Sequence, residues 1–293
     1  MELTYLTIIL AIVSLWHKKL PNLWGYLLGL ALLVGVYREV VQIEGVLYTV
    51  VYIVTAILAI RRKFSINGYE LSTEAKPIIH SAFIVIFVVL TLLLLHHSVP
   101  FYEPWILYSD IVLHENSPAT GMSIKLDNAV VGVVIIALAT TRASTLQQWK
   151  TLLYKSLPYN VGTVAILISI AVYFNFLQFS FVESNYIVPT LISFLFFTCL
   201  AEEAFFRVYV QGNLEMKWSN KRYGNVSALM VASLIFGLAH YQGGPYLVLV
   251  ATLAGIGYGL CYQKTGRVEA AIIAHFCLNS FHFVFLTYPH ALQ

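Results

Sequence analysis

Long apolar runs, separated by short polar connections, dominate the chain. Most of them have roughly the length of 15 to 25 residues with which a helix crosses a bilayer. They lie near residues 2–16, 22–37, 45–60, 78–95, 128–141, 159–175, 187–206, 225–240, 247–263 and 270–287. The pattern predicts an all-α fold, a polytopic integral membrane bundle of about ten transmembrane segments, within a range of about 8 to 10 because short runs also fit re-entrant or tilted segments.

Composition and charge agree with a membrane protein. Of the 293 residues, 59% are hydrophobic and 11% are charged, whereas a soluble domain carries roughly 25% charged residues. The formal net charge of +3 is spread over many connections, without a basic run or stripe. Nucleic acid is therefore not expected as a partner, and membrane lipids are the expected surroundings.

The basic residues test the segmentation, because lysine and arginine accumulate in cytoplasmic connections. All of the 17 basic residues except Arg38 and Lys125 fall in alternate connections. They are Lys18 and Lys19; Arg61, Arg62, Lys63 and Lys76; Arg142, Lys150 and Lys155; Arg207, Lys217, Lys221 and Arg222; and Lys264 and Arg267. This places both termini outside the cytoplasm and makes the connection near 96–127, rich in aromatic residues, a non-cytoplasmic loop.

The seventh run carries two adjacent glutamates and an arginine. An ionisable side chain at the centre of a span costs at least about 2.5 to 3.5 kcal/mol, so each one needs a partner or a function. Glu203 and Arg207 are four residues apart on a helix, in the favourable order for an ion pair. Glu202 points about 100° away from Glu203 and is left without a partner, unless both glutamates simply share Arg207 as a structural cluster.

Two later runs add imidazoles and an amide. His240 ends the eighth run, just before a Gly-Gly-Pro break that is tolerated at membrane depth only beside protein or a watery cavity. His275 and Asn279 lie four apart on one face of the tenth run. The structural alternatives are a helix-end histidine for His240, and interhelical hydrogen bonding for His275 and Asn279.

Together these residues form a set suited to hydrolysis. A carboxylate and an imidazole can act as general bases toward water, and His and Asn side chains can stabilise an oxyanion. If the seventh run ends near residue 206, however, His240 would lie at the opposite membrane face from Glu202. Either part of 207–225 folds back into the membrane, which we favour, or the Gly-Gly-Pro break brings His240 to the site.

Three motifs carry these residues in order along the chain. EExxxR is matched by Glu202, Glu203 and Arg207; FxxxH by Phe236 and His240; and HxxxN by His275 and Asn279. In this order they resemble the motifs of the CAAX protease and bacteriocin-processing family, also called CPBP or ABI, which includes the Ras-converting CAAX endopeptidase. The resemblance covers about residues 187–285, so we divide the chain into N-terminal transmembrane helices of unassigned role, 1–158, and a catalytic transmembrane core, 159–293.

The resemblance implies an intramembrane endopeptidase of the glutamate type, without a cofactor. The implied substrate is a protein or peptide, lipid-modified, membrane-anchored or processed at its C-terminus. The implied roles are Glu202 as general base with His240, His275 and Asn279 as oxyanion hole, and Glu203 and Arg207 as structural support. We expect a prokaryotic plasma membrane, since no retention signal is present, with the active site facing the cytoplasm.

Three alternatives remain open at this stage. Glu202, His240 and His275 would also serve as the ligands of a catalytic zinc, although no HExxH motif is present. A thiol protease would use Cys199 or Cys277. A transporter or membrane scaffold would use the polar face without catalysis.

Overall fold

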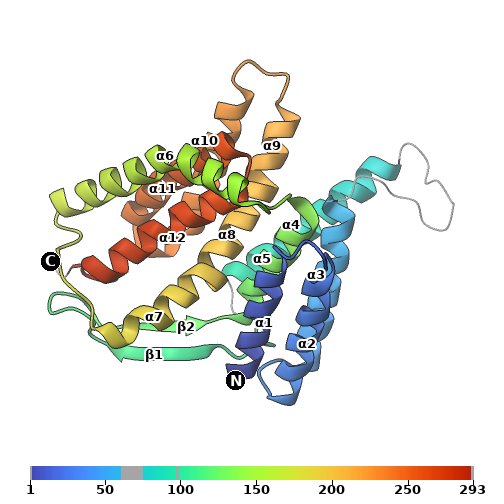
Figure 1. Ribbon diagram of the computed structural model, residues 1–293, viewed down its shortest axis with the longest axis horizontal. Helices are drawn as coiled ribbons and strands as arrows, with labels where there is room; N and C mark the ends of the chain where they lie inside the picture. The colour runs from blue at the N-terminus through green and yellow to red at the C-terminus, as the bar shows by residue number, and fades with distance from the viewer. Residues whose placement is uncertain (1, 61–74, 97–98, 292–293) are drawn as a thin grey trace. The chain divides into compact units, whose positions relative to one another are not determined.

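The computed structural model describes residues 2–60, 75–96 and 99–291, and helices account for most of them (Figure 1). By contacts the chain forms two compact units, the first Met1–Glu103 with Lys125–Thr140 and the second Pro104–Ile124 with Thr141–Gln293. The sequence boundary at residue 158 falls inside a helix of the second unit, Leu146–Tyr173. That 159–293 forms the catalytic core stays a prediction.

The first unit is organised around one buried helix. Its helices are α1 (Glu2–Ser14), α2 (Leu23–Tyr37), α3 (Ile43–Ile60), α4 (Ala75–His96) and α5 (Leu126–Ala139). Almost every residue of α5 from Leu126 to Ile136 is buried, and α5 contacts the other four helices. This burial follows from its sequence, because a helix that is apolar on all sides must be enclosed.

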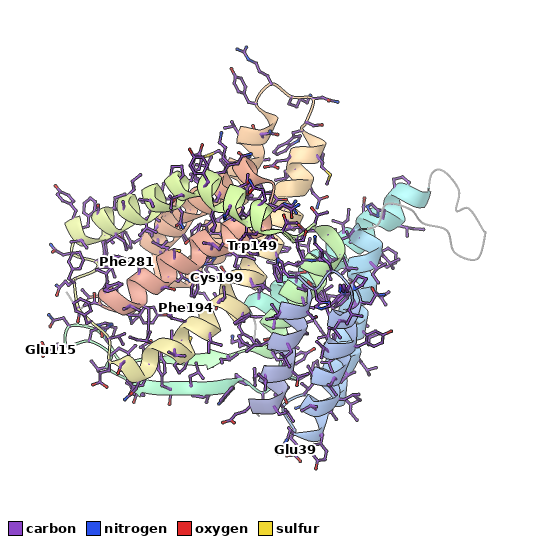
Figure 2. All side chains as sticks on the ribbon, viewed as in Figure 1. Glu39, Glu115, Trp149, Phe194, Cys199 and Phe281 are labelled. Atoms are coloured by element: carbon purple, nitrogen blue, oxygen red, sulfur yellow. The ribbon has the colours of Figure 1, made fainter. Side chains whose placement is uncertain are left out.

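The second unit contains the three motifs. Its main helices are α6 (Leu146–Tyr173), α7 (Ser184–Ser193), α8 (Leu200–Glu203), α9 (Gly212–Lys217), α10 (Gly224–Ala239), α11 (Gly244–Thr265) and α12 (Val268–Phe285). Two π-helical stretches, η1 (Phe194–Cys199) and η2 (Ala204–Gln211), join α7, α8 and α9 into one continuous helix, Ser184–Lys217. We call this 34-residue element the long helix; Phe194 and Cys199 lie along it (Figure 2).

Each of the ten predicted runs falls on a helix, and the prediction of an all-α polytopic bundle is confirmed. In the described part of the chain six helices are long and apolar enough to cross a membrane: Ile43–Ile60, Pro77–Leu95, Leu146–Tyr173, Ser184–Lys217, Tyr241–Thr265 and Val268–Phe285. The other four runs form shorter apolar helices of 10–17 residues. The connection with Arg61, Arg62 and Lys63 lies outside the described residues.

The sequence suggested that the connection near 96–127 is a loop, but the structure shows more than a loop there. It contains two antiparallel strands, β1 (Trp105–Ile111) and β2 (Thr120–Ile124), with Trp105 opposite Ile124. The pairing shifts register twice, and such irregularity removes the simple alternation that marks a strand in a sequence. The strands pack on α7, where the hydroxyls of Tyr108 and Thr190 are 3.1 Å apart.

The long helix also corrects the predicted end of the seventh run. It continues to Lys217 rather than stopping near residue 206, so Glu202 lies near its middle, about 22 Å from Lys217 at 1.5 Å per residue. His240, at the far end of α10, lies about 24 Å along that helix from Gly224 by the same measure. The expected fold-back of 207–225 is thus a helical hairpin, and it removes the conflict over the depth of His240.

Candidate active site

The two glutamates occupy the short α-helical segment between two π-helical stretches. Leu200–Glu203 is flanked by η1 and η2. A π-helical turn holds more residues than an α-helical one and recurs at functional sites. It rotates the side chains that follow, so the face on which each glutamate lies cannot be read from a regular period of 3.6 residues. No sequence signal that we used indicated these stretches.

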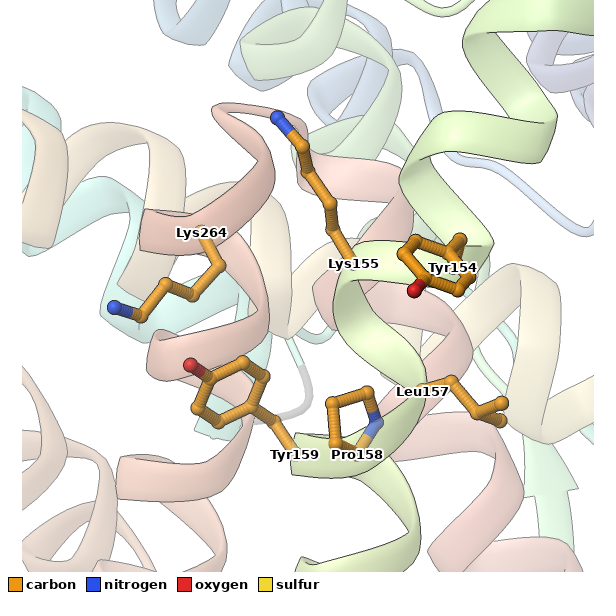
Figure 3. Close-up of a pocket in the computed structure, with 6 residues that line it drawn as sticks. All are labelled: Tyr154, Lys155, Leu157, Pro158, Tyr159 and Lys264. Atoms are coloured by element: carbon orange, nitrogen blue, oxygen red, sulfur yellow. The ribbon is translucent and has the colours of Figure 1, made fainter.

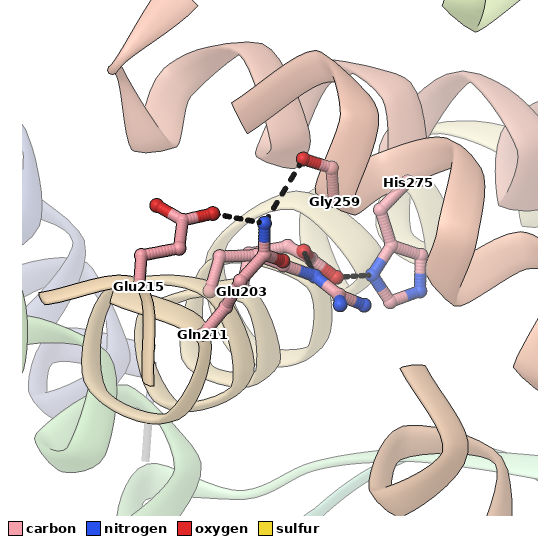
Figure 4. A network of polar contacts seen from close by, with 6 residues as sticks. Glu203, Gln211, Glu215, Gly259 and His275 are labelled. Carbon is pink, nitrogen blue, oxygen red and sulfur yellow. Dashed lines mark hydrogen bonds and ion pairs between the residues drawn. The ribbon is translucent and has the colours of Figure 1, made fainter. Parts of the chain in front are cut away.

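Glu203 is the centre of a buried ionic group. Its Oε2 accepts a hydrogen bond from Arg207 Nε at 2.7 Å, and its Oε1 lies 2.9 Å from His275 Nδ1 (Figure 4). The side chains of Glu203 and Arg207 are completely buried, and that of His275 is 5% exposed. The predicted Glu203–Arg207 pair is present, and His275 is bonded to the same carboxylate rather than standing apart from it.

Glu202 differs from Glu203 in the partners of its carboxylate. Its Oε2 is buried, and among the described residues no side chain or backbone group donates a hydrogen bond to it. Because a buried polar atom without a hydrogen bond costs free energy, such an atom in a native structure calls for an explanation. Glu202 is therefore free to bind water or substrate, in contrast to Glu203.

The backbone contact of His240 indicates which of its ring nitrogens carries a proton. His240 Nδ1 lies 2.8 Å from the carbonyl oxygen of Phe236. A carbonyl only accepts, so Nδ1 carries the proton, and the Nε2 of the neutral ring is an acceptor. Close packing of α10 on α11 holds this helix end in place, because a Cβ at Gly237 would lie 2.6 Å from the backbone oxygen of Val248.

Two aromatic rings connect the motifs, and the sequence analysis assigned neither of them a role. The Phe236 ring lies 4.8 Å from the His240 ring and 5.8 Å from the His275 ring, and the Arg207 guanidinium lies 5.2 Å from its centre. Tyr258 of α11 stacks on His275 at 4.6 Å. The role of Phe236 could have been predicted, because this residue begins the FxxxH motif. Nothing in the sequence near Tyr258 indicated its contact with His275.

Asn279 lies one turn beyond His275 and reaches the long helix. Its Nδ2 is 3.9 Å from the Sγ of Cys199, a weak contact because sulfur is a poor acceptor. The amide therefore retains most of its capacity to donate to another group. Cys199 is completely buried, which does not suit a nucleophilic thiol, since reactive cysteines are partly exposed in electropositive surroundings.

Gln211 extends the polar stripe of the long helix toward α9. It is four residues after Arg207, fully buried, and its Nε2 donates to Glu215 Oε1 at 2.9 Å and to the Gly259 carbonyl at 3.2 Å (Figure 4). Glu215 also accepts from Gln263 Nε2 at 2.8 Å. The spacing of four residues was visible in the sequence, and this network ties the long helix to α11.

We expect Gln211→Leu to lower the free energy of unfolding by about 1 to 3 kcal/mol, because a buried hydrogen bond to a charged carboxylate is lost. Unfolding of the purified chain in detergent measures the change. Gln147→Leu, at an exposed position on α6, is the control and should have little effect. Equal stability of the two variants would contradict a structural role for the Gln211 network.

In the described ranges, no group of three His, Cys, Asp or Glu side chains is placed so that it could hold a metal ion. Glu202, His240 and His275 therefore do not form a ligand set in this conformation. His275 Nδ1 is already bonded to Glu203, which leaves only its Nε2 for any further contact.

Comparison with known proteins identifies the segment that carries these residues. Residues 184–281, a third of the chain, match the family model described as type II CAAX prenyl endopeptidase Rce1-like. Searches of curated proteins and of solved structures gave no significant match. The family predicted from the three motifs is thereby confirmed, and a protease is favoured over the transporter or scaffold alternative. The chain is an integral membrane protein, and its residues 184–281 match the Rce1-like CAAX endopeptidase family, whose members are proteases.

Proposed function

We propose that the chain is a glutamate-type intramembrane endopeptidase, which hydrolyses a peptide bond in a prenylated or otherwise membrane-anchored protein. The observation that carries the proposal is the different environment of the two glutamates. Glu203 is fully engaged by Arg207 and His275, while Glu202 keeps a buried oxygen that has no hydrogen-bond partner among the described residues. The site would face the cytoplasm, in line with the distribution of basic residues, and the membrane we propose is a prokaryotic plasma membrane.

In this mechanism Glu202 takes a proton from water as the water attacks the scissile carbonyl. His240 assists, since its Nε2 is the acceptor nitrogen of the ring when Nδ1 donates to Phe236. The attack forms a C–O bond and places a negative charge on the carbonyl oxygen. Collapse of this intermediate breaks the C–N bond, and the proton held by Glu202 passes to the leaving amine.

His275 and Asn279 would stabilise the oxyanion. Glu203 Oε1 accepts from His275 Nδ1, so Nδ1 carries a proton and a protonated ring has Nε2–H left to donate. The carboxylate of Glu203 fixes the orientation of this ring, as outer carboxylates do for other functional histidines. Asn279 supplies an amide donor from one turn further along α12.

Glu203 and Arg207 are positioning residues in this mechanism. Glu203 contacts His275 directly, and Arg207 acts on His275 through Glu203. Neither is assigned a contact with substrate. Arg207 Nη1 and Nη2 are buried without a hydrogen-bond partner in the described part of the chain, and the guanidinium lies over the Phe236 ring. The cation–π contact offsets part of the cost of burying this charge.

The proposal is tested with the purified full chain in liposomes that contain a prenylated, membrane-anchored CAAX peptide. In water enriched in the heavy oxygen isotope, hydrolysis should place one labelled oxygen in the new C-terminal carboxylate, detected by mass spectrometry. A second arm uses a membrane-anchored peptide without a prenyl group. Cleavage of the first peptide alone supports prenyl recognition, and failure to cleave either peptide contradicts the proposed function.

Metal removal separates the glutamate mechanism from the zinc alternative. We expect a strong chelator to leave the rate of cleavage unchanged, because the described residues offer no three-ligand group for a metal. Loss of activity that zinc restores would instead favour Glu202, His240 and His275 as ligands, brought together on metal binding. Metal analysis of the purified protein provides an independent measurement.

A further inference from the structure

Helix α6 is longer than a membrane core requires. Its 28 residues span about 42 Å, compared with about 30 Å for the hydrocarbon layer. Its polar residues gather in the first part, LQQWKTLLYK, while the last part is nearly all apolar. The first part therefore extends into the headgroup layer, and Tyr154 and Lys155 lie near the level at which the hydrocarbon ends.

Helix α11 runs antiparallel to α6 and ends at the same level. Cys261 Sγ contacts the Ser156 carbonyl at 3.7 Å, and Gly257 approaches the Thr163 side chain. Lys264, in the last turn of α11, has its Nζ 5.8 Å from the centre of the Tyr159 ring. Two lysines from different helices thus lie at one depth, which the basic-residue pattern assigns to the cytoplasmic side.

A pocket of about 570 Å³ lies between these two helix ends. It is lined by Tyr154, Lys155, Leu157, Pro158, Tyr159 and Lys264 (Figure 3). The lining has two ammonium groups, two phenols and two apolar side chains, Leu157 and Pro158, and no carboxylate. Lys155, Lys264 and Tyr154 are exposed, so the positive groups are accessible to a ligand that approaches from the membrane.

We propose that this pocket binds the headgroup of an anionic phospholipid. The phosphate accepts from the lysine ammonium groups and the tyrosine hydroxyls, while Leu157 and Pro158 contact the glycerol and the first methylenes of the acyl chains. Lysines at the membrane surface attract anionic lipids, and tyrosines prefer this layer because a ring and a hydroxyl meet both phases.

The exposed apolar side chains in the lining favour a lipid over a free phosphate ion. A soluble anion gains nothing from Leu157, whose side chain is 57% exposed, or from Pro158. A phospholipid buries this surface in addition to neutralising the two charges. The site lies on α6 and α11 and uses none of the residues assigned to catalysis.

The test measures lipid binding to the full chain by native mass spectrometry, after transfer from nanodiscs with equal amounts of phosphatidylglycerol and phosphatidylcholine. We expect phosphatidylglycerol to be retained preferentially. The variant Lys155→Gln/Lys264→Gln should weaken this binding by about fivefold for each lysine. The matched control is Lys217→Gln/Lys221→Gln, which removes the same charge at exposed positions of the same unit.

Additional arms make each outcome decisive. Lys155→Arg/Lys264→Arg keeps the charge and should keep the binding, and catalytic activity verifies that each variant is folded. Excess inorganic phosphate should not displace the lipid. The proposal is overturned by equal retention of the two lipids, by equal losses in the control and test variants, or by displacement with inorganic phosphate.

Discussion

Replacing Glu202 by glutamine is expected to reduce the rate of peptide cleavage by a factor of about 10² to 10⁴, the usual contribution of a general base. Glutamine has nearly the same size and can still bind water, but it cannot take up the proton. Because Glu202 makes no ion pair with Arg207, the change should leave the fold intact. Initial rates on the membrane-anchored peptide, with unfolding followed in parallel, measure both effects.

Glu183→Gln is the matched control for Glu202→Gln. Glu183 precedes the first residue of the same long helix, is exposed, and makes no side-chain capping hydrogen bond. The same chemical change there should preserve the rate. Glu202→Gln activity within a few-fold of the unchanged protein would reject Glu202 as the base, and a comparable loss in Glu183→Gln would point to a general effect of charge.

Glu203→Gln should have the largest effect on stability, with a loss of about 3 to 5 kcal/mol in the free energy of unfolding. The substitution leaves the completely buried Arg207 without a counter-charge, and an unpaired buried ion carries the full cost of desolvation. It also removes the charged acceptor of His275 Nδ1. Denaturant or thermal unfolding in detergent measures the loss, and cleavage should fall as well.

The variant Glu203→Gln/Arg207→Met distinguishes an unpaired charge from lost packing. Removing both charges should restore much of the stability, because a buried ion pair replaced by neutral groups of similar volume is often tolerated. Cleavage should remain low, since His275 still lacks its carboxylate. A double variant as unstable as Glu203→Gln would contradict the electrostatic explanation and indicate that the shape of these side chains is what matters.

The apolar runs predicted the helices well but not their ends. Apolar side chains avoid water either in the hydrocarbon layer or inside the protein, and a helix satisfies its own backbone hydrogen bonds there, so the ten runs all fall on helices. The end of a helix depends on neighbours as well. The long helix continues past residue 206 because Arg207 and Gln211, polar in the sequence, find partners in Glu203, Glu215 and the Gly259 carbonyl.

The sequence by itself determined the membrane location, the three motifs and the pairing of Glu203 with Arg207, since all of these depend on local composition or on a spacing of four residues. Only the tertiary structure decided that His275 bonds to Glu203, and that Phe236 lies beside His275. These two contacts join residues 72 and 39 positions apart in the sequence. They depend on the packing of α12 beside the long helix and α10 and on the rotation that the π-helical stretches introduce, and neither of these follows from a local period.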